Sequence, residues 1–399
     1  MKKFIITLTL LTIFSCTTKE VFIEEIPFLY GDNNAQPNLV SSNGTLSLSW
    51  ISSKKENKAS LHFSQFKKGK WIKPQTIANG SDWFVNWADF PAHAINKDLI
   101  ITSHLKKSAS GTYTYDVILN LKKLSGEKIK ENFLLNTDGV KAEHGFVSII
   151  PNNNKGFFIT WLDGRNTVEK KLDGHHKPMT IRFAEITNKG DIINESELDA
   201  AVCDCCQTSI EMTNNGPIIV YRDRSEKEVR DIYTIRNING VWEEPNPLHN
   251  DGWIINGCPV NGPKVAVNST NLAIAWFTVV NNSPLVNVSF SKTNGDSFGT
   301  PFKLNDHDAL GRVDVAFLNN EEVIVSYMEV DDIGTYLRIK KVSVNGKVSK
   351  PITISKIDGG RNTGVPQLEV INNEIFIVWT ISVEGMNQLK SIKLSSKNI

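Results

Sequence analysis

One short strand pattern recurs along the chain at a nearly constant interval. Apolar residues alternate with other residues and the run closes on an aromatic residue, as in FFITW, which ends at Trp161. The pattern ends at Trp50, Trp161, Tyr221, Trp276, Tyr327 and Trp379, and a weaker copy, LIITS, ends at Ser103. In chain order, successive copies end 53, 58, 60, 55, 51 and 52 residues apart. A steady period of about 55 residues, built from short strands, is typical of radial repetition around an axis and not of separate domains.

A second pattern lies between the copies of the first. A glycine turn is followed by a proline, as in GKWIKP at 69–74 and GVWEEP at 240–245. GKVSKP at 346–351 and the looser GDSFGTP at 295–301 repeat it. This is a hairpin turn that leads into an outer edge strand, where a proline removes no ladder hydrogen bond. Each repeat therefore predicts four strands, which make one blade of a β-propeller.

The repeat count predicts an all-β fold, a single β-propeller of seven four-stranded blades. The alternative is six blades, if the weak copy ending at Ser103 is not a blade. The seventh repeat reaches the chain end without an outer strand, and VFIEEIPFLYG at 21–31 has the character of one. Pairing this N-terminal strand with the last blade would close the ring and remove free sheet edges.

The first residues, MKKFIITLTLLTIFSC, have the features of a secretory signal. Two lysines precede an apolar run that is too short to span a bilayer as a helix. The run ends in IFSC, which resembles a bacterial lipoprotein box, so Cys16 is the predicted lipid-modified residue. The alternative is an ordinary signal peptide with a coincidental cysteine. We expect a signal peptide at 1–15, a lipidated tether at 16–20 and the propeller domain at 21–399, exported and anchored to either leaflet of the outer membrane.

Charge and composition narrow the range of partners. The formal net charge is +1, and the lysines are scattered and not interleaved with aromatic residues, so we expect no nucleic-acid binding. No later stretch is apolar enough to span a membrane, so membrane contact is expected through the lipid anchor only. We expect the protein to be a monomer.

Propeller topology gathers the starts of the innermost strands and the ends of the next strands on one face, around the mouth of the central channel. The residues predicted to ring the mouth are Asp89, His93, His144, Asp204, Arg312, Asp314 and Arg361, with Asp163, Arg165, Arg222, Asp223, Arg224 and Glu329 just outside. The predicted ligand-binding residues among them are Arg222, Asp223, Arg224, Arg312, Asp314, Arg361, His93 and His144. Arginines mixed with carboxylates suit an anionic or polyhydroxylated ligand. The alternative is that these residues pair with one another and cap the channel as buried salt bridges.

Three cysteines, Cys203, Cys205 and Cys206, fall within four residues, and Cys258 is the one other cysteine after Cys16. Thiols outside the cytoplasm tend to oxidise, so a disulfide from Cys258 to Cys203 or Cys205 is one interpretation. A copper or zinc site built from these thiolates and a histidine of the channel mouth is a second. A redox-active pair is the third. On a strand, Cys203 and Cys205 would face one side and Cys206 the other.

SKTNGDSF at 291–298 resembles a degenerate Asp-box, the repeat of bacterial neuraminidases, with Thr293 in place of its aspartate. The whole mature chain resembles exported bacterial propellers placed in the sialidase superfamily, through VCDCCQTS, VYRDRSEKEVRDI, DGWIINGCPVNGP and GRVDV. In a true sialidase, the resemblance implies three arginines on the substrate carboxylate, a tyrosine activated by a glutamate, and an aspartate as acid/base. The Arg-Ile-Pro motif of the first arginine is absent. Arg224, Arg312 and Arg361 could imitate the set.

These features predict a membrane-anchored, sialidase-like propeller that binds an anionic or glycan ligand at the channel mouth without sialidase turnover. The first alternative is a glycoside hydrolase of the exo-sialidase type, acting on surface or extracellular glycans. It would need two suitably spaced carboxyl groups, for which Asp89, Asp204 and Asp314 are the candidates. The second alternative is a copper- or zinc-handling lipoprotein that uses the cysteine cluster. The fold alone does not decide between them.

Overall fold

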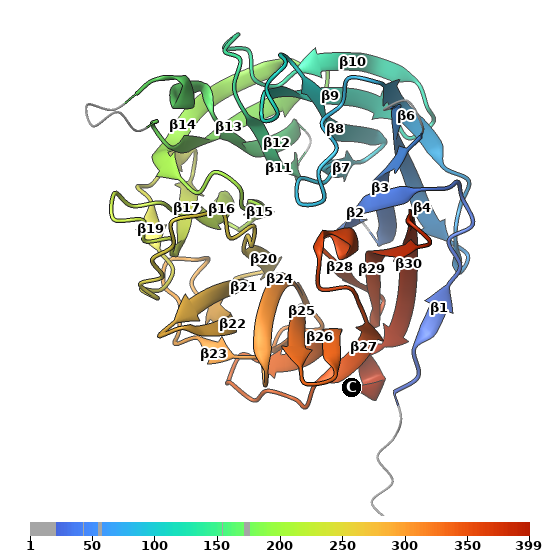
Figure 1. The fold of residues 1–399 in the computed structure, drawn as a ribbon, viewed down its shortest axis with the longest axis vertical. Coiled ribbons are helices and arrows are strands. Elements are labelled where there is room, and N and C mark those ends of the chain that lie inside the picture. The colour runs from blue at the N-terminus through green and yellow to red at the C-terminus, as the bar shows by residue number, and fades with distance from the viewer. Residues whose placement is uncertain (1–20, 43, 55–57, 154, 171–175) are drawn as a thin grey trace, which may run out of the picture.

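Seven antiparallel sheets stand around a central axis, each with its innermost strand nearest the axis (Figure 1). The structure is a computed structural model and describes residues 21–399 except 43, 55–57, 154 and 171–175. The predicted seven-bladed propeller is confirmed, and the weak copy ending at Ser103 is a strand of the second blade. Cys16 and the predicted signal peptide and tether lie outside the described residues. In the described part of the chain, no helix combines the length and hydropathy needed to cross a membrane.

The first four blades, numbered in chain order, follow the predicted four-strand plan, with one additional two-residue strand in blade 1 (β5, Lys70–Trp71) and in blade 4 (β18, Val241–Trp242). Blade 1 contains β2 (Asn34–Ser42), β3 (Thr45–Ser53), β4 (Ala59–Lys67), β5 (Lys70–Trp71) and β6 (Gln75–Gly80). Blade 2 contains β7 (His93–Asn96), β8 (Leu99–Lys107), β9 (Tyr115–Lys123) and β10 (Lys128–Leu134). Blade 3 contains β11 (His144–Asn152), β12 (Gly156–Asp163), β13 (Met179–Thr187) and β14 (Ile192–Val202). Blade 4 contains β15 (Ser209–Met212), β16 (Pro217–Arg222), β17 (Ile232–Ile238), β18 (Val241–Trp242) and β19 (Asn246–Pro247).

The last three blades repeat the plan, and the N-terminal strand completes the seventh. Blade 5 contains β20 (Lys264–Asn268), β21 (Asn271–Val280), β22 (Ser283–Ser291) and β23 (Phe302–Lys303). Blade 6 contains β24 (Asp308–Phe317), β25 (Glu322–Asp331), β26 (Gly334–Ser343) and β27 (Ile352–Lys356). Blade 7 contains β28 (Gln367–Ile371), β29 (Glu374–Val383), β30 (Met386–Ser395) and β1 (Glu24–Ile26). Two short 3-10 helices of the described residues lie in connections, η1 (Arg165–Val168) and η2 (Arg361–Thr363), and a third, η3 (Ser396–Asn398), follows β30.

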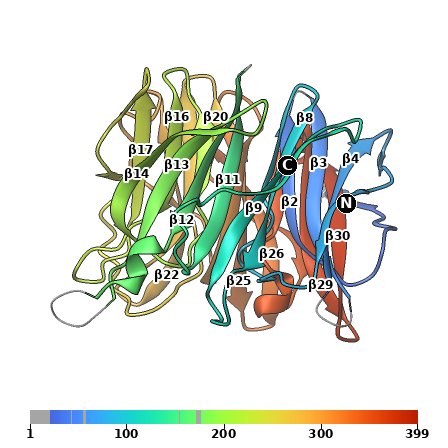
Figure 2. The same cartoon turned by 90° about the horizontal axis from the view of Figure 1, so that it is seen from above.

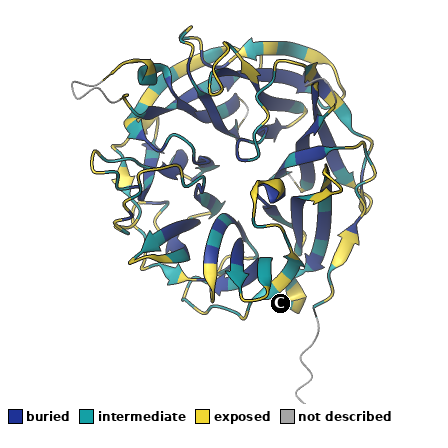
Figure 3. Cartoon of the chain, in the orientation of Figure 1, coloured by how far each residue is buried: buried dark blue, intermediate teal, exposed yellow. Residues whose placement is uncertain are grey.

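The repeated strand pattern is explained by packing between blades. Side chains alternate between the two faces of a strand, so each blade presents apolar residues to both of its neighbours. Among the described residues, seven hydrophobic clusters each join two adjacent blades. Trp161 of blade 3, for example, is fully buried with Tyr115 of blade 2. The buried surface therefore runs around the ring between the blades, and exposed residues gather at the outer edges and loops (Figure 3).

The outer strands begin where the proline pattern predicts. The four prolines of that pattern each directly precede an outer strand: Pro74 before β6, Pro245 before β19, Pro301 before β23 and Pro351 before β27. The glycine of GKVSKP, Gly346, has a φ of 87°, and a Cβ there would lie 2.4 Å from the Phe302 ring. Only glycine fits such a turn without strain.

Strand β1 closes the ring as predicted. It pairs antiparallel with β30, from Glu24 opposite Lys393 to Ile26 opposite Ser391. The Ser391 hydroxyl donates to the carbonyl of Ile26 at 2.8 Å, and the indole of Trp71 in blade 1 donates to the same hydroxyl at 3.0 Å. The last blade is thus fastened to the first through a strand from the other chain end.

The seven innermost strands leave a channel along the axis, and the loops gather on the two faces of the disc (Figure 2). We call the face on which the innermost strands begin the cap face. The ends of the second strands lie on this face too, because each pairs antiparallel with an innermost strand, as His144 pairs with Asp163.

Candidate functional site

A loop covers the channel on the cap face. Residues 86–90, which we call the cap loop, lie between β6 and β7 and reach toward the axis (Figure 1). The carbonyl of Ala88 accepts a hydrogen bond at 2.8 Å from the Gln207 side chain of blade 4. The Trp87 ring lies 4.5 Å from the guanidinium of Arg312 in blade 6. Because the cap loop contacts blades on several sides, it covers the mouth at which the sequence analysis expected a ligand.

Under the cap loop, the channel encloses about 550 Å3 and is lined by charge. Its charged residues are Asp89, Glu211, Lys264, Asp314 and Glu369. Burial raises the pKa of Asp89 to about 8, of Glu211 to about 7 and of Glu369 to about 8, and it also raises the pKa of Asp314. Sequence reasoning missed Glu211 and Glu369, although each is an acidic residue on an innermost strand. Asp89 and Asp314, two of the three catalytic candidates, thus belong to the channel.

The two histidines predicted at the mouth are both fully buried. Both ring nitrogens of His93 lie 2.9 Å from serine hydroxyls of blade 1, and burial lowers its pKa to about 3, so the ring is neutral. The Nε2 atom of His144 faces two carboxylates, with Asp138 at 3.4 Å and Asp163 at 3.6 Å. These three side chains could share a cation, at a place separate from the cysteine cluster.

Two of the predicted ligand-binding arginines are bonded to backbone instead. Arg222 is 1% exposed and donates to the carbonyls of Asn261, Arg230 and Phe277. Arg312 donates to carbonyls in residues 359–364, and burial lowers its pKa to about 10. Both side chains hold loops of neighbouring blades together, which leaves few donors for a ligand.

The remaining predicted binding residues are spread over the cap face. Arg224 forms ion pairs with Asp204 at 2.6 Å and with Glu228 at 2.9 Å. Arg361 is exposed in η2, between blades 6 and 7. Asp223 follows β16 directly, and burial together with nearby acidic side chains raises its pKa to about 7. Arg224 belongs to blade 4, Arg312 to blade 6 and Arg361 to the connection between blades 6 and 7, so the three arginines come from different parts of the ring.

An open groove lies beside the cap loop, over blades 2, 3 and 4. It encloses about 1180 Å3 between loops that emerge on the cap face. Its polar lining residues include Tyr113, Lys141, Glu143, His176, Lys177, Asp204 and Arg224. Asp204 and Arg224 are predicted site residues that this groove brings together. Sequence reasoning missed Glu143, which directly precedes the predicted His144.

Among the groove residues, Glu143 has a strongly raised pKa. The Tyr115 hydroxyl donates to its carboxylate at 2.5 Å. Burial raises the pKa of Glu143 to about 7, and the charge of Asp204 adds to the rise. Burial also raises the pKa of Asp204, against the charge of Arg224. Glu143 can therefore exchange a proton near neutral pH, whereas Tyr115, at 1% exposure, cannot reach a ligand in the groove.

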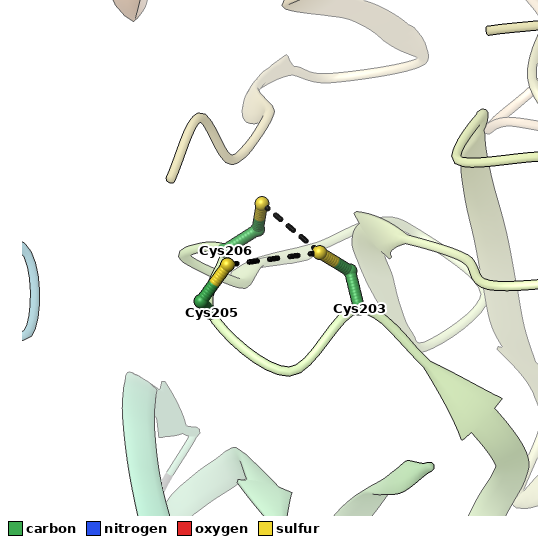
Figure 4. Close-up of side chains that lie close together, drawn as sticks. All are labelled: Cys203, Cys205 and Cys206. Carbon is green, nitrogen blue, oxygen red and sulfur yellow. Dashed lines mark hydrogen bonds between the residues drawn. The ribbon is translucent and has the colours of Figure 1, made fainter. Parts of the chain in front are cut away.

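The three clustered cysteines lie in a turn between β14 and β15, which we call the thiol loop (residues 203–206). The Sγ atom of Cys203 lies 3.4 Å from that of Cys206 and 4.0 Å from that of Cys205 (Figure 4). The expectation that Cys206 points away from the other two is wrong, because the chain turns here and is not a strand. Hydrogen bonds from the neighbouring thiols, helped by nearby arginines, hold the pKa of Cys203 well below its usual range.

Cys258 completes the group from the connection between blades 4 and 5. It is exposed, and its interaction with the thiol of Cys205 lowers the pKa of Cys258. All four cysteines are free thiols in the structure. The predicted closeness of Cys258 to the thiol loop is met, and a disulfide between them stays a prediction.

No family model matches the chain, and neither does any curated protein. Solved structures match it over most of its length. An ulvan lyase of polysaccharide lyase family PL25, bound to -[GlcA(1-4)Rha3S]-, matches at 9% identity with a TM-score of 0.55, over 93% of this chain and 96% of that one. The phage phi92 endosialidase matches at 8% identity and a TM-score of 0.51, over 94% of this chain and 69% of that one. At such identities the likeness establishes a propeller fold shared with carbohydrate-active proteins.

Proposed function

We propose that this protein binds an acidic glycan in the groove over blades 2–4 and does not act as a sialidase. The observation that carries the proposal is the groove itself, an open hollow of about 1180 Å3 on a face whose channel mouth is covered. Tyr113 stands in it with 61% of its surface exposed, steadied by an edge contact with Phe84 at 6.0 Å. An exposed aromatic ring held in place is a surface on which a sugar ring can stack.

One cation of the groove, Lys141, is available to an acidic ligand. The carboxylates of Asp204 and Glu228 are paired with Arg224, so they contribute little free negative charge. Lys141, by contrast, has no partner closer than a carboxylate oxygen 3.9 Å away. This lysine is available for the carboxylate or sulfate groups of a glycan. The ulvan lyase, a propeller of the same fold, was solved with a glucuronate–rhamnose sulfate fragment, which supports this class of ligand.

Two features argue against sialidase chemistry. The tyrosine that is paired with the groove residue Glu143, Tyr115, is buried and does not line the groove. Of the arginines that could imitate the sialidase set, Arg312 donates its hydrogen bonds to backbone carbonyls, and Arg224 is paired with Asp204 and Glu228.

Glycoside hydrolysis is the second candidate function, and the pair Glu143 and Asp204 favours it. Both carboxyl groups line the groove, and the pKa of Glu143 is raised to about 7, which suits a general acid. If the protein hydrolyses a glycan, Glu143→Gln should abolish the release of new reducing ends while binding persists. Equal product release by the variant would rule Glu143 out as the acid.

Calorimetric titration with a sulfated glucuronate–rhamnose oligosaccharide tests the binding proposal, with a neutral oligosaccharide of equal length as comparison. We expect the acidic sugar to bind more tightly, and Tyr113→Ala to weaken binding about fivefold, because a stacking contact is worth about 1 kcal/mol. Phe22→Ala, which removes another exposed ring far from the groove, is the matched control and should leave the affinity unchanged.

Two results would contradict the proposal. One is an array of acidic and neutral glycans that yields no ligand at all. The other is a ligand whose affinity is the same for the wild type and Tyr113→Ala.

We also propose that Cys16 carries a lipid that anchors the exported protein to the outer membrane. The support is the sequence of residues 1–16 alone. Cys16→Ala should move the protein from the membrane fraction to the soluble fraction on cell fractionation, since a lipid chain supplies the expected attachment. Unchanged membrane association would count against the anchor.

A further inference from the structure

We propose that the thiol loop and Cys258 bind a soft metal cation, Cu(I) or Zn(II), beside the groove. The inference does not depend on glycan binding. It follows from the positions of four sulfur atoms that are contributed by two neighbouring blades.

The spacing of the sulfurs fits a shared metal. A tetrahedral zinc site with Zn–S bonds of about 2.3 Å places its sulfurs about 3.8 Å apart. The two Sγ–Sγ distances from Cys203, 3.4 Å to Cys206 and 4.0 Å to Cys205, lie on either side of that value. All three Sγ atoms of the thiol loop lie within 4.8 Å of one another, and the sulfurs of Cys205 and Cys206 both lie beside that of Cys203 (Figure 4). The turn therefore already holds three ligands in position.

A buried arginine stabilises negative charge on the sulfur of Cys203. The guanidinium of Arg230, 3% exposed, donates to the Sγ atom of Cys203 at 3.2 Å. Glu228 fixes that guanidinium through two hydrogen bonds, at 2.5 and 3.1 Å. Such a donor orients a ligating thiolate and offsets its charge, which is the usual role of residues around a metal site. Cys203 and Cys206 are themselves buried, so a metal here would be shielded from water.

Cys258 gives the site an opening. Cys258 is exposed and interacts with Cys205, but it lies outside the group that the three sulfurs of the thiol loop form, so it would have to move inward to serve as a fourth ligand on the solvent side. Asp204, between two of the cysteines, lines the groove and marks the route of entry. Zn(II) in a closed site takes four ligands and would need Cys258. Cu(I) is selected by soft thiolates and can be held by the three sulfurs of the thiol loop.

The competing chemistry is oxidation of the same sulfurs to two disulfides, Cys203–Cys206 and Cys205–Cys258. The two outcomes exclude each other, because a sulfur in a disulfide has no thiolate to offer a metal. The protein isolated from its native compartment distinguishes them. We expect about one zinc or copper per chain by elemental analysis, and thiol-loop cysteines that alkylate only after a chelator has removed the metal.

Titration of the reduced, metal-free protein identifies the metal. Cys206→Ser should abolish binding of both Zn²⁺ and Cu⁺. Cys258→Ser should weaken Zn²⁺ binding more than tenfold and leave Cu⁺ binding nearly unchanged. Asn256→Ser changes an exposed residue next to Cys258 and serves as the control.

A second measurement uses only the wild type and therefore does not depend on whether a variant folds. If the thiols bind a metal, adding that metal should protect them from alkylation. Stoichiometric disulfides in the isolated protein would overturn the proposal. So would a reduced protein that binds neither ion.

Discussion

At the scale of single residues, charge at a strand end did not predict the role of the side chain. Arg222 stands in the stretch YRDRS, which the sequence analysis placed at the ligand site, yet its guanidinium is buried against three backbone carbonyls. Those carbonyls belong to residues 8 to 55 positions further along the chain. No local pattern reveals them, because they are brought together only by the packing of blade 4 on blade 5. Glu143 was missed for the same reason, since its acidity depends on burial beside Tyr115.

Arg222→Met should therefore lower the free energy of unfolding by at least about 3 kcal/mol, because it leaves buried carbonyls without donors. Urea unfolding measures the change. Arg361→Ala, at an exposed position, should stay within about 0.5 kcal/mol of the wild type. If the two variants had the same free energy of unfolding, Arg222 would not have a structural role, and it would again be a candidate ligand-binding residue.

At the scale of strands and loops, the regular elements could be predicted and the cap loop could not. The strand ending at Trp161 and the turn at Gly346 recur because every blade must meet the same two neighbours, so the same pattern is required seven times. The cap loop occurs once. It is stabilised by contacts such as Ala88 with Gln207 and Trp87 with Arg312, whose partners lie on distant blades. Such contacts are set by the closed ring and leave no period in the sequence.

Strand β1 provides a test of closure at this scale. Deleting residues 21–31 from a chain that otherwise begins at residue 21 should destabilise the whole domain by at least about 3 kcal/mol, since loss of the buried Ile26 side chain alone costs about 2 to 5 kcal/mol. Calorimetry should show one transition at a lower temperature, because the open edge of β30 affects the entire ring. A transition unchanged from the longer chain would mean that the ring closes without β1.

At the scale of the whole molecule, closing seven blades creates an acidic channel that no single blade possesses. Glu211 from blade 4, Asp314 from blade 6 and Glu369 from blade 7 come from strands far apart in sequence. Asp314 raises the pKa of Glu211, and both raise the pKa of Glu369. Lys264 of blade 5 is the one described cation of the channel lining. The channel therefore favours the protonated form of these carboxyl groups. The stability of the whole ring should depend on pH as a result.

The sign of that dependence follows from proton uptake. The pKa of Glu369 rises from an ordinary 4.5 to about 8 on folding, chiefly through burial, and Asp314 and Glu211 add to the rise. The folded state thus binds more protons than the unfolded state between these pH values. As the pH rises through this range, such a carboxyl group can lower the free energy of unfolding by up to about 1.4 kcal/mol per pH unit. Its contribution to stability is complete below about pH 4.5 and is lost as the pH rises through 8.

We therefore expect the wild-type protein to melt at a lower temperature at pH 8.5 than at pH 5.5, and Glu369→Gln to reduce that difference. The amide is neutral at both values and can still accept the hydrogen bond that Ser41 donates to Glu369 at 2.8 Å. Glu384→Gln, an exposed change in the turn between β29 and β30, should keep the wild-type dependence. Melting curves recorded by circular dichroism across this range compare the three proteins. If Glu369→Gln and Glu384→Gln showed the same pH dependence, the channel carboxyl groups would not be the source of the effect.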